Sequence, residues 1–164
     1  MLEPMSPADE AAITAQLQRT PRGAAGVAYR CPCSRPAVVL TRPRLPDGTP
    51  FPTMYYLTCP RAVAGCSALE SQGLMTDMSR RLEHDQDLAA AYRRAHEGYL
   101  ADREELDSVP EIADVSAGGM PDRVKCLHAL VAHSLAAGPG VNPLGDEAAL
   151  LLGAFWSRPC LEDA

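Results

Sequence analysis

The stretch AVVLTRPRLPDGTPFPTMYYLT, residues 37–58, contains the most specific fold signal in the sequence. Its first five residues are rich in β-branched side chains and stand between two prolines, which is typical of a strand. The turn sequence LPDGTP follows, where Asp47 and Gly48 supply the backbone conformations that a tight hairpin turn requires. The last six residues, 53–58, predict the returning strand. The stretch therefore predicts an antiparallel β-hairpin.

The rest of the chain has mainly helical patterns. Ser6 precedes Pro7 and a first turn that contains acidic residues, which is typical of a helix start. Pro121 opens the most apolar helical segment, and Asp146 is the expected N-cap of the last helix. The expected helices cover residues 7–19, 60–73, 75–83, 85–106, 122–137 and 147–155. The predicted fold class is α+β: a mostly helical single domain in which a small antiparallel β-hairpin packs on about five helices.

The domain organisation follows from the length and the breaks in pattern. The chain has 164 residues, the usual size of one domain. We expect residues 1–24 to form an N-terminal helix and a flexible connector, and residues 25–156 to form a single globular domain. Residues 157–164 are expected to form a C-terminal tail.

Composition excludes some functions. The formal net charge is -6 and aromatic residues make up 5% of the chain, which disfavours a general nucleic-acid binder. No apolar stretch is long enough to span a membrane, and the N-terminus does not resemble a secretory signal. We therefore expect a cytoplasmic protein, in which the six cysteines are metal ligands, reactive thiols or core residues before they are disulfides.

Three cysteines lie near the predicted hairpin. Cys59 precedes Pro60 at a helix start, where unpaired N–H groups, the helix dipole and Arg61 favour a thiolate. A cysteine that merely caps the helix is equally consistent with this position. Cys31 and Cys33 flank a proline, and their spacing puts both side chains on one face of an extended segment. One ligand plus one core residue is as consistent with that spacing as two ligands. Cys66 and Cys160 are expected to be a core residue and an incidental one.

The segment RVKCLHALVAH, residues 123–133, contains Cys126, His128 and His133. If it is one continuous helix, residues two apart point in nearly opposite directions, so Cys126 and His128 cannot bind one ion. Cys126 and His133 share a face but lie about 10 Å apart along the axis. At most one of the two histidines joins Cys126, and a histidine on an apolar face is more often a core residue.

Anion binding is a further hypothesis for the same region. Arg123 and Lys125 stand near the expected helix start, and Arg61 occupies the equivalent place after Cys59. Surface positions without a ligand are the simpler interpretation.

Two blocks of sequence resemble a known bacterial family. The first runs from CPCSRPAVV at residues 31–39 through RLPDGTPFPT to YYLTCP, and the second from GMPDRVKCLH at residues 119–128 to NPLGD. These blocks are similar to the family catalogued as domain of unknown function 501, which is common in actinobacteria. The similarity covers roughly residues 25–150 and assigns no function. It singles out the following positions: Cys31, Cys59, Cys126, His128 and His133. Ser34 stands where the family usually has glycine.

These observations support three hypotheses of function. The leading one is a metal centre formed by Cys31, Cys59 and Cys126, with His128, His133 or Cys33 as the fourth ligand. Structural zinc is favoured over an iron–sulfur cluster. The second is a metal-free thiol enzyme with Cys59 as nucleophile, a histidine base and a small anionic substrate. The third is an interaction module that docks a protein partner through the charged 85–106 helix.

Overall fold

A computed structural model describes residues 3–161 of the chain, so the outermost parts of the expected N-terminal segment and C-terminal tail, residues 1–2 and 162–164, lie outside the described residues. The fold is α+β in one domain, as predicted, and most of its secondary-structure elements are helices. In chain order the elements are α1 (Pro7–Leu17), β1 (Ala24–Arg30), β2 (Pro36–Thr41), β3 (Tyr55–Leu57), α2 (Pro60–Ser71), α3 (Leu74–His84), α4 (Gln86–Leu106), η1 (Pro110–Ile112), α5 (Leu127–Ala137), α6 (Pro143–Leu151) and η2 (Phe155–Ser157).

The predicted hairpin is confirmed as β2 and β3, which pair antiparallel with Val39 opposite Tyr56. At its tip, Gly48 adopts φ 88° and its N–H donates to Leu45 O at 2.9 Å. Asp47 Oδ1 accepts the N–H of Thr49 at 3.0 Å, which closes the turn. The sheet has a third strand, β1, which pairs antiparallel with β2. It begins at Ala24 and so includes the end of the expected flexible connector.

Helix α1 begins as the sequence predicts. Ser6 is its N-cap: the Ser6 hydroxyl accepts the N–H of Asp9 and the Asp9 carboxylate accepts the N–H of Ser6, which makes a capping box. Arg30 of β1 forms an ion pair with Asp9 at 2.7 Å. The hydrogen bond from Arg30 lowers the pKa of Asp9 to about 2. This ion pair attaches α1 to the first strand of the sheet.

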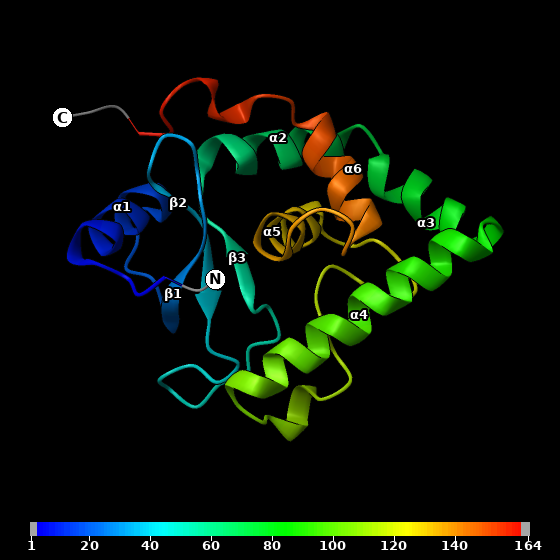
Figure 1. Cartoon of the computed structure of the whole chain (residues 1–164), viewed down its shortest axis with the longest axis horizontal. Helices are drawn as coiled ribbons and strands as arrows, with labels where there is room; N and C mark the ends of the chain where they lie inside the picture. Colours follow the sequence, from blue (N-terminus) through cyan, green and yellow to red (C-terminus); the bar gives the residue numbers. More distant parts are fainter. Residues whose placement is uncertain (1–2, 162–164) are drawn as a thin grey trace.

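The sheet is covered on both faces, with α1 on one side and α5 on the other (Figure 1). Side chains alternate along β2, so Val38 and Leu40 belong to the main core under α5. Val39 is also buried but points to the opposite face. The strand β2 is consequently buried along its whole length.

Helix α5 lies at the centre of the molecule. Seven of its eleven residues are buried, and it packs against β3, α2 and α6 (Figure 1). A helix that is apolar on nearly every side is stable only when other elements enclose it. The other helices and the sheet are therefore arranged around α5.

The predicted start and end of the last helix are wrong. α6 begins at Pro143, and its N-cap is Asn142, whose Oδ1 accepts the N–H of Gly145 at 3.0 Å. Residues 143–146, which the sequence analysis placed before the helix, thus form its first turn. The Asp146 carboxylate instead accepts hydrogen bonds from the Ser134 hydroxyl and from the N–H of Gly140. These bonds connect α6 to the end of α5.

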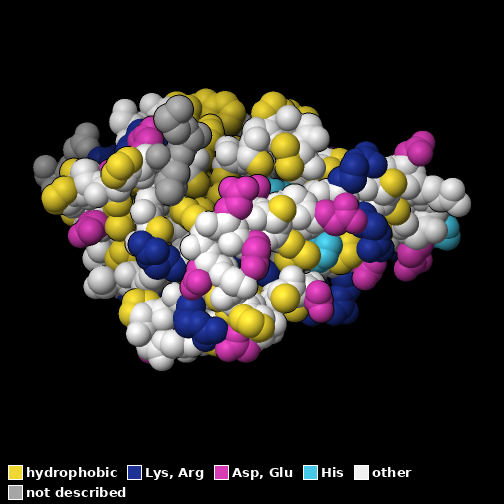
Figure 2. All heavy atoms as spheres, turned by 60° about the horizontal axis from the view of Figure 1, so that its bottom comes forward, with side chains coloured by type: hydrophobic (Ala, Val, Ile, Leu, Met, Phe, Trp, Pro, Cys, Tyr) yellow, Lys and Arg dark blue, Asp and Glu magenta, His cyan; other side chains and the backbone are white. Residues whose placement is uncertain are grey.

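Helix α4 is amphipathic, and it buries Tyr92, Ala95, Tyr99 and Arg103 against the domain. In Figure 2 the bottom of Figure 1 comes forward, and acidic and basic side chains are interspersed over this face. The face therefore has no large area of one charge. Among residues 3–161, no helix combines the length and the apolar character needed to cross a membrane.

Gly145 marks the closest approach of α5 and α6. A Cβ atom at this position would lie within 3.1 Å of three atoms of α5, two of which belong to the backbone of Leu130. Gly145→Ala should therefore separate the helices and lower the free energy of unfolding by about 2–3 kcal/mol, measured by urea denaturation. Gly98→Ala in α4 is the matched control, because a Cβ there meets nothing within 4 Å. It should be neutral or stabilise by up to ~1 kcal/mol. Equal effects at the two positions would contradict this interpretation.

Candidate metal centre

The loop before α5 determines how the site forms. α5 begins at Leu127, so the predicted start at Asp122 is wrong. The N–H of Lys125 donates to Gly118 O at 2.7 Å, and the N–H of Val124 donates to Ser79 Oγ at 3.0 Å. These partners satisfy backbone groups that a helix would otherwise bond internally. Residues 121–126 therefore precede the helix as a loop.

Cys126 is the N-cap of α5 and has an extended backbone, with φ -154° and ψ 110°. The angular step of a helix does not apply between such a residue and the first turn. Its Sγ lies 3.9 Å from Nδ1 of His128. The prediction that helical geometry separates these two side chains is wrong, because it assumed a helix at position 126.

Glu70 of α2 completes the group. Its Oε1 lies 3.0 Å from His128 Nδ1 and accepts the N–H of Leu127 at 2.8 Å. One ligand atom from each of Glu70, Cys126 and His128 lies within 4.8 Å of the others, so the three residues can hold a metal ion. All three side chains are half-buried. The sequence analysis missed Glu70, since an acidic residue in a helix has no local pattern that indicates such a contact.

The second nitrogen of the imidazole also has a partner. His128 Nε2 lies 3.3 Å from the hydroxyl of Ser67, one turn before Glu70 on α2. A histidine that binds a metal through one nitrogen usually donates the N–H of the other to a nearby acceptor, which orients the ring. Ser67 is in the position to accept that bond when Nδ1 is the ligand.

The thiol and the imidazole change each other's acidity. The hydrogen bond to Cys126, assisted by Glu70, raises the pKa of His128 to about 9 despite partial burial. Burial raises the pKa of Cys126, but the hydrogen bond and charge of His128 together with the backbone N–H of Ala129 outweigh it, and the net direction is downward. The pair therefore favours a thiolate beside an imidazolium, and the thiolate is the form of cysteine that binds metals and acts as a nucleophile.

The other predicted cysteine ligands lie elsewhere. Cys59 is the N-cap of α2 and fully buried. Eleven helical residues, or about 16 Å, separate that end of α2 from Glu70. Cys31 and Cys33 lie near Cys59 instead. Both Cys33 and Cys59 are close enough to Cys31 to contribute to the raised pKa of its thiol. The structure thus divides the predicted single centre into two groups at opposite ends of α2. Cys66 is buried, as predicted.

His133 is part of the aromatic core. Its ring stacks on Tyr55 at 5.8 Å between centroids and meets the edge of Tyr99 at 5.1 Å. Nδ1 accepts a hydrogen bond from Asn142 Nδ2 at 3.2 Å. Nε2 has no hydrogen-bond partner among the residues described. Burial lowers the pKa of His133 to about 4, so the ring is neutral at pH 7. The structure does not bring His133 to Cys126.

The predicted anion-binding residues are also divided. Arg123 and Lys125 line a pocket of about 460 Å³ together with Asp114 and Asp122. These carboxylates oppose the binding of an anion there. Arg61 lies at the start of α2, where its Nε donates to Pro159 O at 2.9 Å. It belongs with the first group of cysteines.

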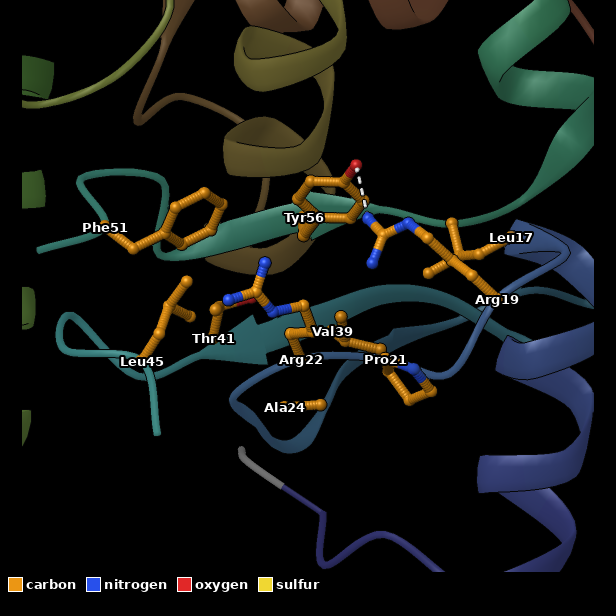
Figure 3. Close-up of a pocket in the computed structure, with 10 residues that line it drawn as sticks. All are labelled: Leu17, Arg19, Pro21, Arg22, Ala24, Val39, Thr41, Leu45, Phe51 and Tyr56. Carbon is orange, nitrogen blue, oxygen red and sulfur yellow. Dashed lines mark hydrogen bonds between the residues drawn. The ribbon is translucent and has the colours of Figure 1, made fainter. Parts of the chain in front are cut away.

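A separate pocket of about 240 Å³ lies on the α1 face of the sheet (Figure 3). Its walls are mostly apolar, and two arginines stand at its sides. Arg19 donates to the hydroxyl of Tyr56 at 3.3 Å, and Arg22 forms an ion pair with Asp47. Both cations already have partners within the chain.

Comparison with known proteins identifies the family. The family described as "Protein of unknown function (DUF501)" matches residues 27–149, about three quarters of the chain. The chain belongs to this family, which confirms the resemblance seen in the sequence. No curated protein and no solved structure matches it.

The buried neutral His133 makes a pH-dependent contribution to stability. Its pKa is about 4 in the folded protein against 6.5 for a free side chain, so the unfolded chain binds the proton first as the pH falls. The free energy of unfolding should therefore fall by up to about 3 kcal/mol between pH 6.5 and pH 4. Nearby Asp146 opposes this shift only partly. Urea denaturation across that range measures the slope.

In His133→Gln this part of the slope should disappear, although the variant is less stable at pH 7. The exposed His84→Gln should retain the slope of the parent protein. Half-buried His96 also has a lowered pKa, so a small residual slope is expected. An unchanged slope in His133→Gln would show that His133 is not the titrating group.

Proposed function

We propose that this protein binds zinc and that Glu70, Cys126 and His128 are the ligands. The observation that supports the proposal is the meeting of one carboxylate oxygen, one thiol and one imidazole nitrogen within 4.8 Å, contributed by two separate segments of chain. In this site Cys126 and His128 keep the role expected for them, while Glu70 replaces the cysteines of the hairpin.

The chemistry of the donors supports zinc over other metals. Mg²⁺ and Ca²⁺ prefer oxygen ligands, whereas a thiolate with an imidazole suits Zn²⁺. Three protein ligands leave one position of a tetrahedral ion open, and the side chains of Glu70 and His128 remain 23% and 26% exposed. The proposed site is therefore open to water or a substrate, in contrast to the closed Cys3His centre predicted from the sequence.

The hydrogen bonds around the three residues support binding through His128 Nδ1. A zinc ion would replace the proton between Nδ1 and Glu70 Oε1, which are 3.0 Å apart. Ser67 would then accept the N–H of Nε2. An ion held in this way acts as a Lewis acid or lowers the pKa of a bound water, which is the usual chemistry of zinc with an open position.

Metal analysis tests the proposal. Protein purified without chelators and dialysed should contain about one zinc ion per chain. Glu70→Gln, Cys126→Ser and His128→Gln should each lose most of the zinc. Glu70→Gln is informative because its amide oxygen can still accept the Leu127 N–H. The matched controls are Glu83→Gln and His84→Gln, which alter exposed side chains of α3 and should retain the metal.

Thermal unfolding tests the same site by a second measurement. Zinc at about 100 times its Kd should stabilise the folded protein by about 2.7 kcal/mol, which is a rise in Tm of several degrees. The Tm of His128→Gln should not respond to zinc, and a chelator should reverse the rise in the parent protein. A parent protein that binds no zinc and shows no change in Tm would overturn the proposal.

A second candidate is a metal-free thiol enzyme that uses Cys126. The contact between Cys126 Sγ and His128 Nδ1, with the pKa of the thiol lowered and that of the imidazole raised, favours an ion pair of a nucleophilic thiolate and a base. This candidate replaces Cys59, which is fully buried, as the nucleophile.

Alkylation separates the two candidates. In metal-free protein iodoacetamide should modify Cys126 faster than the buried Cys66 in either case, because both candidates need a thiolate at Cys126. Stoichiometric zinc should protect Cys126 only if it is a ligand. Modification at the same rate with and without zinc would favour the thiol enzyme.

The free cysteines are consistent with a reducing compartment, so we also propose the cytoplasm as the location.

A further inference from the structure

A second group of cysteines surrounds the N-terminal end of α2. It contains Cys31 and Cys33 from the turn between β1 and β2, Cys59 from the N-cap of α2, and Cys160 from the C-terminal segment. Cys160 joins this group although 127 residues separate it from Cys33. The proposed zinc site, at the other end of α2, does not use any of the four.

The thiols of Cys33 and Cys160 are in contact. Their Sγ atoms are 3.8 Å apart, and both side chains are half-buried. A disulfide needs about 2.05 Å, so a shift of roughly 2 Å shared between two side chains would join them. Cys31 and Cys59 are 3% and 0% exposed, so a solute reaches Cys33 and Cys160 more readily.

The C-terminal segment is held in place beside Cys33. Arg61 Nε donates to Pro159 O at 2.9 Å, and Arg35 donates to Leu161 O at 3.0 Å. Gln16 Nε2 donates to Cys160 Sγ at 3.3 Å. Contacts from α1, the β1–β2 turn and α2 therefore position Cys160, so its place beside Cys33 does not depend on the thiol contact alone.

The surroundings of Cys33 favour its thiolate. Burial raises its pKa, but hydrogen bonds from the backbone N–H groups of Arg35 and Cys160 and from the thiols of Cys31 and Cys160 together outweigh this and lower the pKa to about 7. For Cys160, burial dominates and raises the pKa. One member of the pair is thus suited to attack an oxidant, and the other remains a thiol that can react in a second step.

We propose that Cys33 and Cys160 are a reversible oxidation site for peroxides, in which Cys33 is the attacking residue and Cys160 the resolving one. The Cys33 thiolate attacks one oxygen of hydrogen peroxide, the O–O bond breaks, and hydroxide leaves, so that Cys33 becomes a sulfenic acid and the hydroxide takes a proton from solvent to become water. The Cys160 sulfur then attacks the Cys33 sulfur, the S–O bond breaks, and the oxygen leaves as water with the Cys160 proton. A dithiol restores both thiols and is itself oxidised to a disulfide.

The disulfide would attach the C-terminal segment covalently to the sheet. Residues 158–161 are otherwise held by hydrogen bonds from side chains on α1, α2 and the β1–β2 turn. In the reduced protein this segment can separate from the domain by breaking those bonds, whereas in the oxidised protein it cannot. The oxidation state would thus control access to the N-terminal end of α2.

Peptide mapping tests this proposal. Fully reduced, metal-free protein is exposed briefly to hydrogen peroxide, alkylated and digested without reductant. The expected product is a disulfide-linked pair of peptides that contains Cys33 and Cys160, and dithiothreitol should remove it. Cys160→Ser should instead accumulate the sulfenic acid of Cys33, which a dimedone probe labels. Cys33→Ser should form neither product, and the buried Cys66 should react at least about tenfold more slowly than Cys33.

Several results would overturn the proposal. A disulfide that joins Cys31 to Cys59, or the absence of any disulfide while a half-buried methionine such as Met75 is oxidised, would contradict it. Zinc analysis could also contradict it. If His128→Gln kept one zinc ion per chain and Cys33→Ser lost it, the four thiols would be a metal site. Mapping of the parent protein decides the question even if a variant fails to fold. The His128→Gln variant should still form the disulfide, so failure of the zinc proposal is distinguishable.

Discussion

The hydrogen bond from the Leu127 N–H to Glu70 Oε1 joins the start of α5, the central helix, to the last turn of α2. The first turn of a helix has N–H groups without internal partners, and a carboxylate is the strongest common acceptor for them. Here the acceptor comes from α2 and not from the residues before α5, so the start of α5 is determined by tertiary contact. Because α5 is enclosed by the sheet, α2 and α6, the position of this start affects the packing of the whole domain.

The same carboxylate orients His128 and lies near Cys126, so the candidate metal centre is located where α2 contacts the start of α5. This explains why polar, ionisable groups persist at the edge of an apolar core, since each of them has a partner. In the proposed zinc site Glu70 would therefore contribute both to stability and to binding. Glu70→Gln, which keeps an acceptor for Leu127, separates these two roles better than removal of the side chain would.

Helix α2 divides the cysteines into two chemical environments. At its N-terminal end, thiols from the β1–β2 turn and from the C-terminal segment lie together, and backbone N–H groups favour the thiolate of Cys33. Near its C-terminal end, an imidazole and a carboxylate surround Cys126. The first environment consists of thiols and suits redox chemistry, while the second mixes nitrogen, oxygen and sulfur donors and suits a metal ion.

Elements with local signals could be predicted from the amino-acid pattern alone. The Asp47-Gly48 turn, the Ser6 cap and the extent of α4 depend on neighbours within a few residues, and each was predicted correctly. Contacts between distant segments set the starts of α5 and α6 and bring Cys126 to His128. Ser79 and Gly118 bind the backbone that a helix would otherwise have used, and Glu70 caps the helix from a distant element. Contacts between residues far apart in the chain leave no periodic signal, so sequence patterns cannot reveal them.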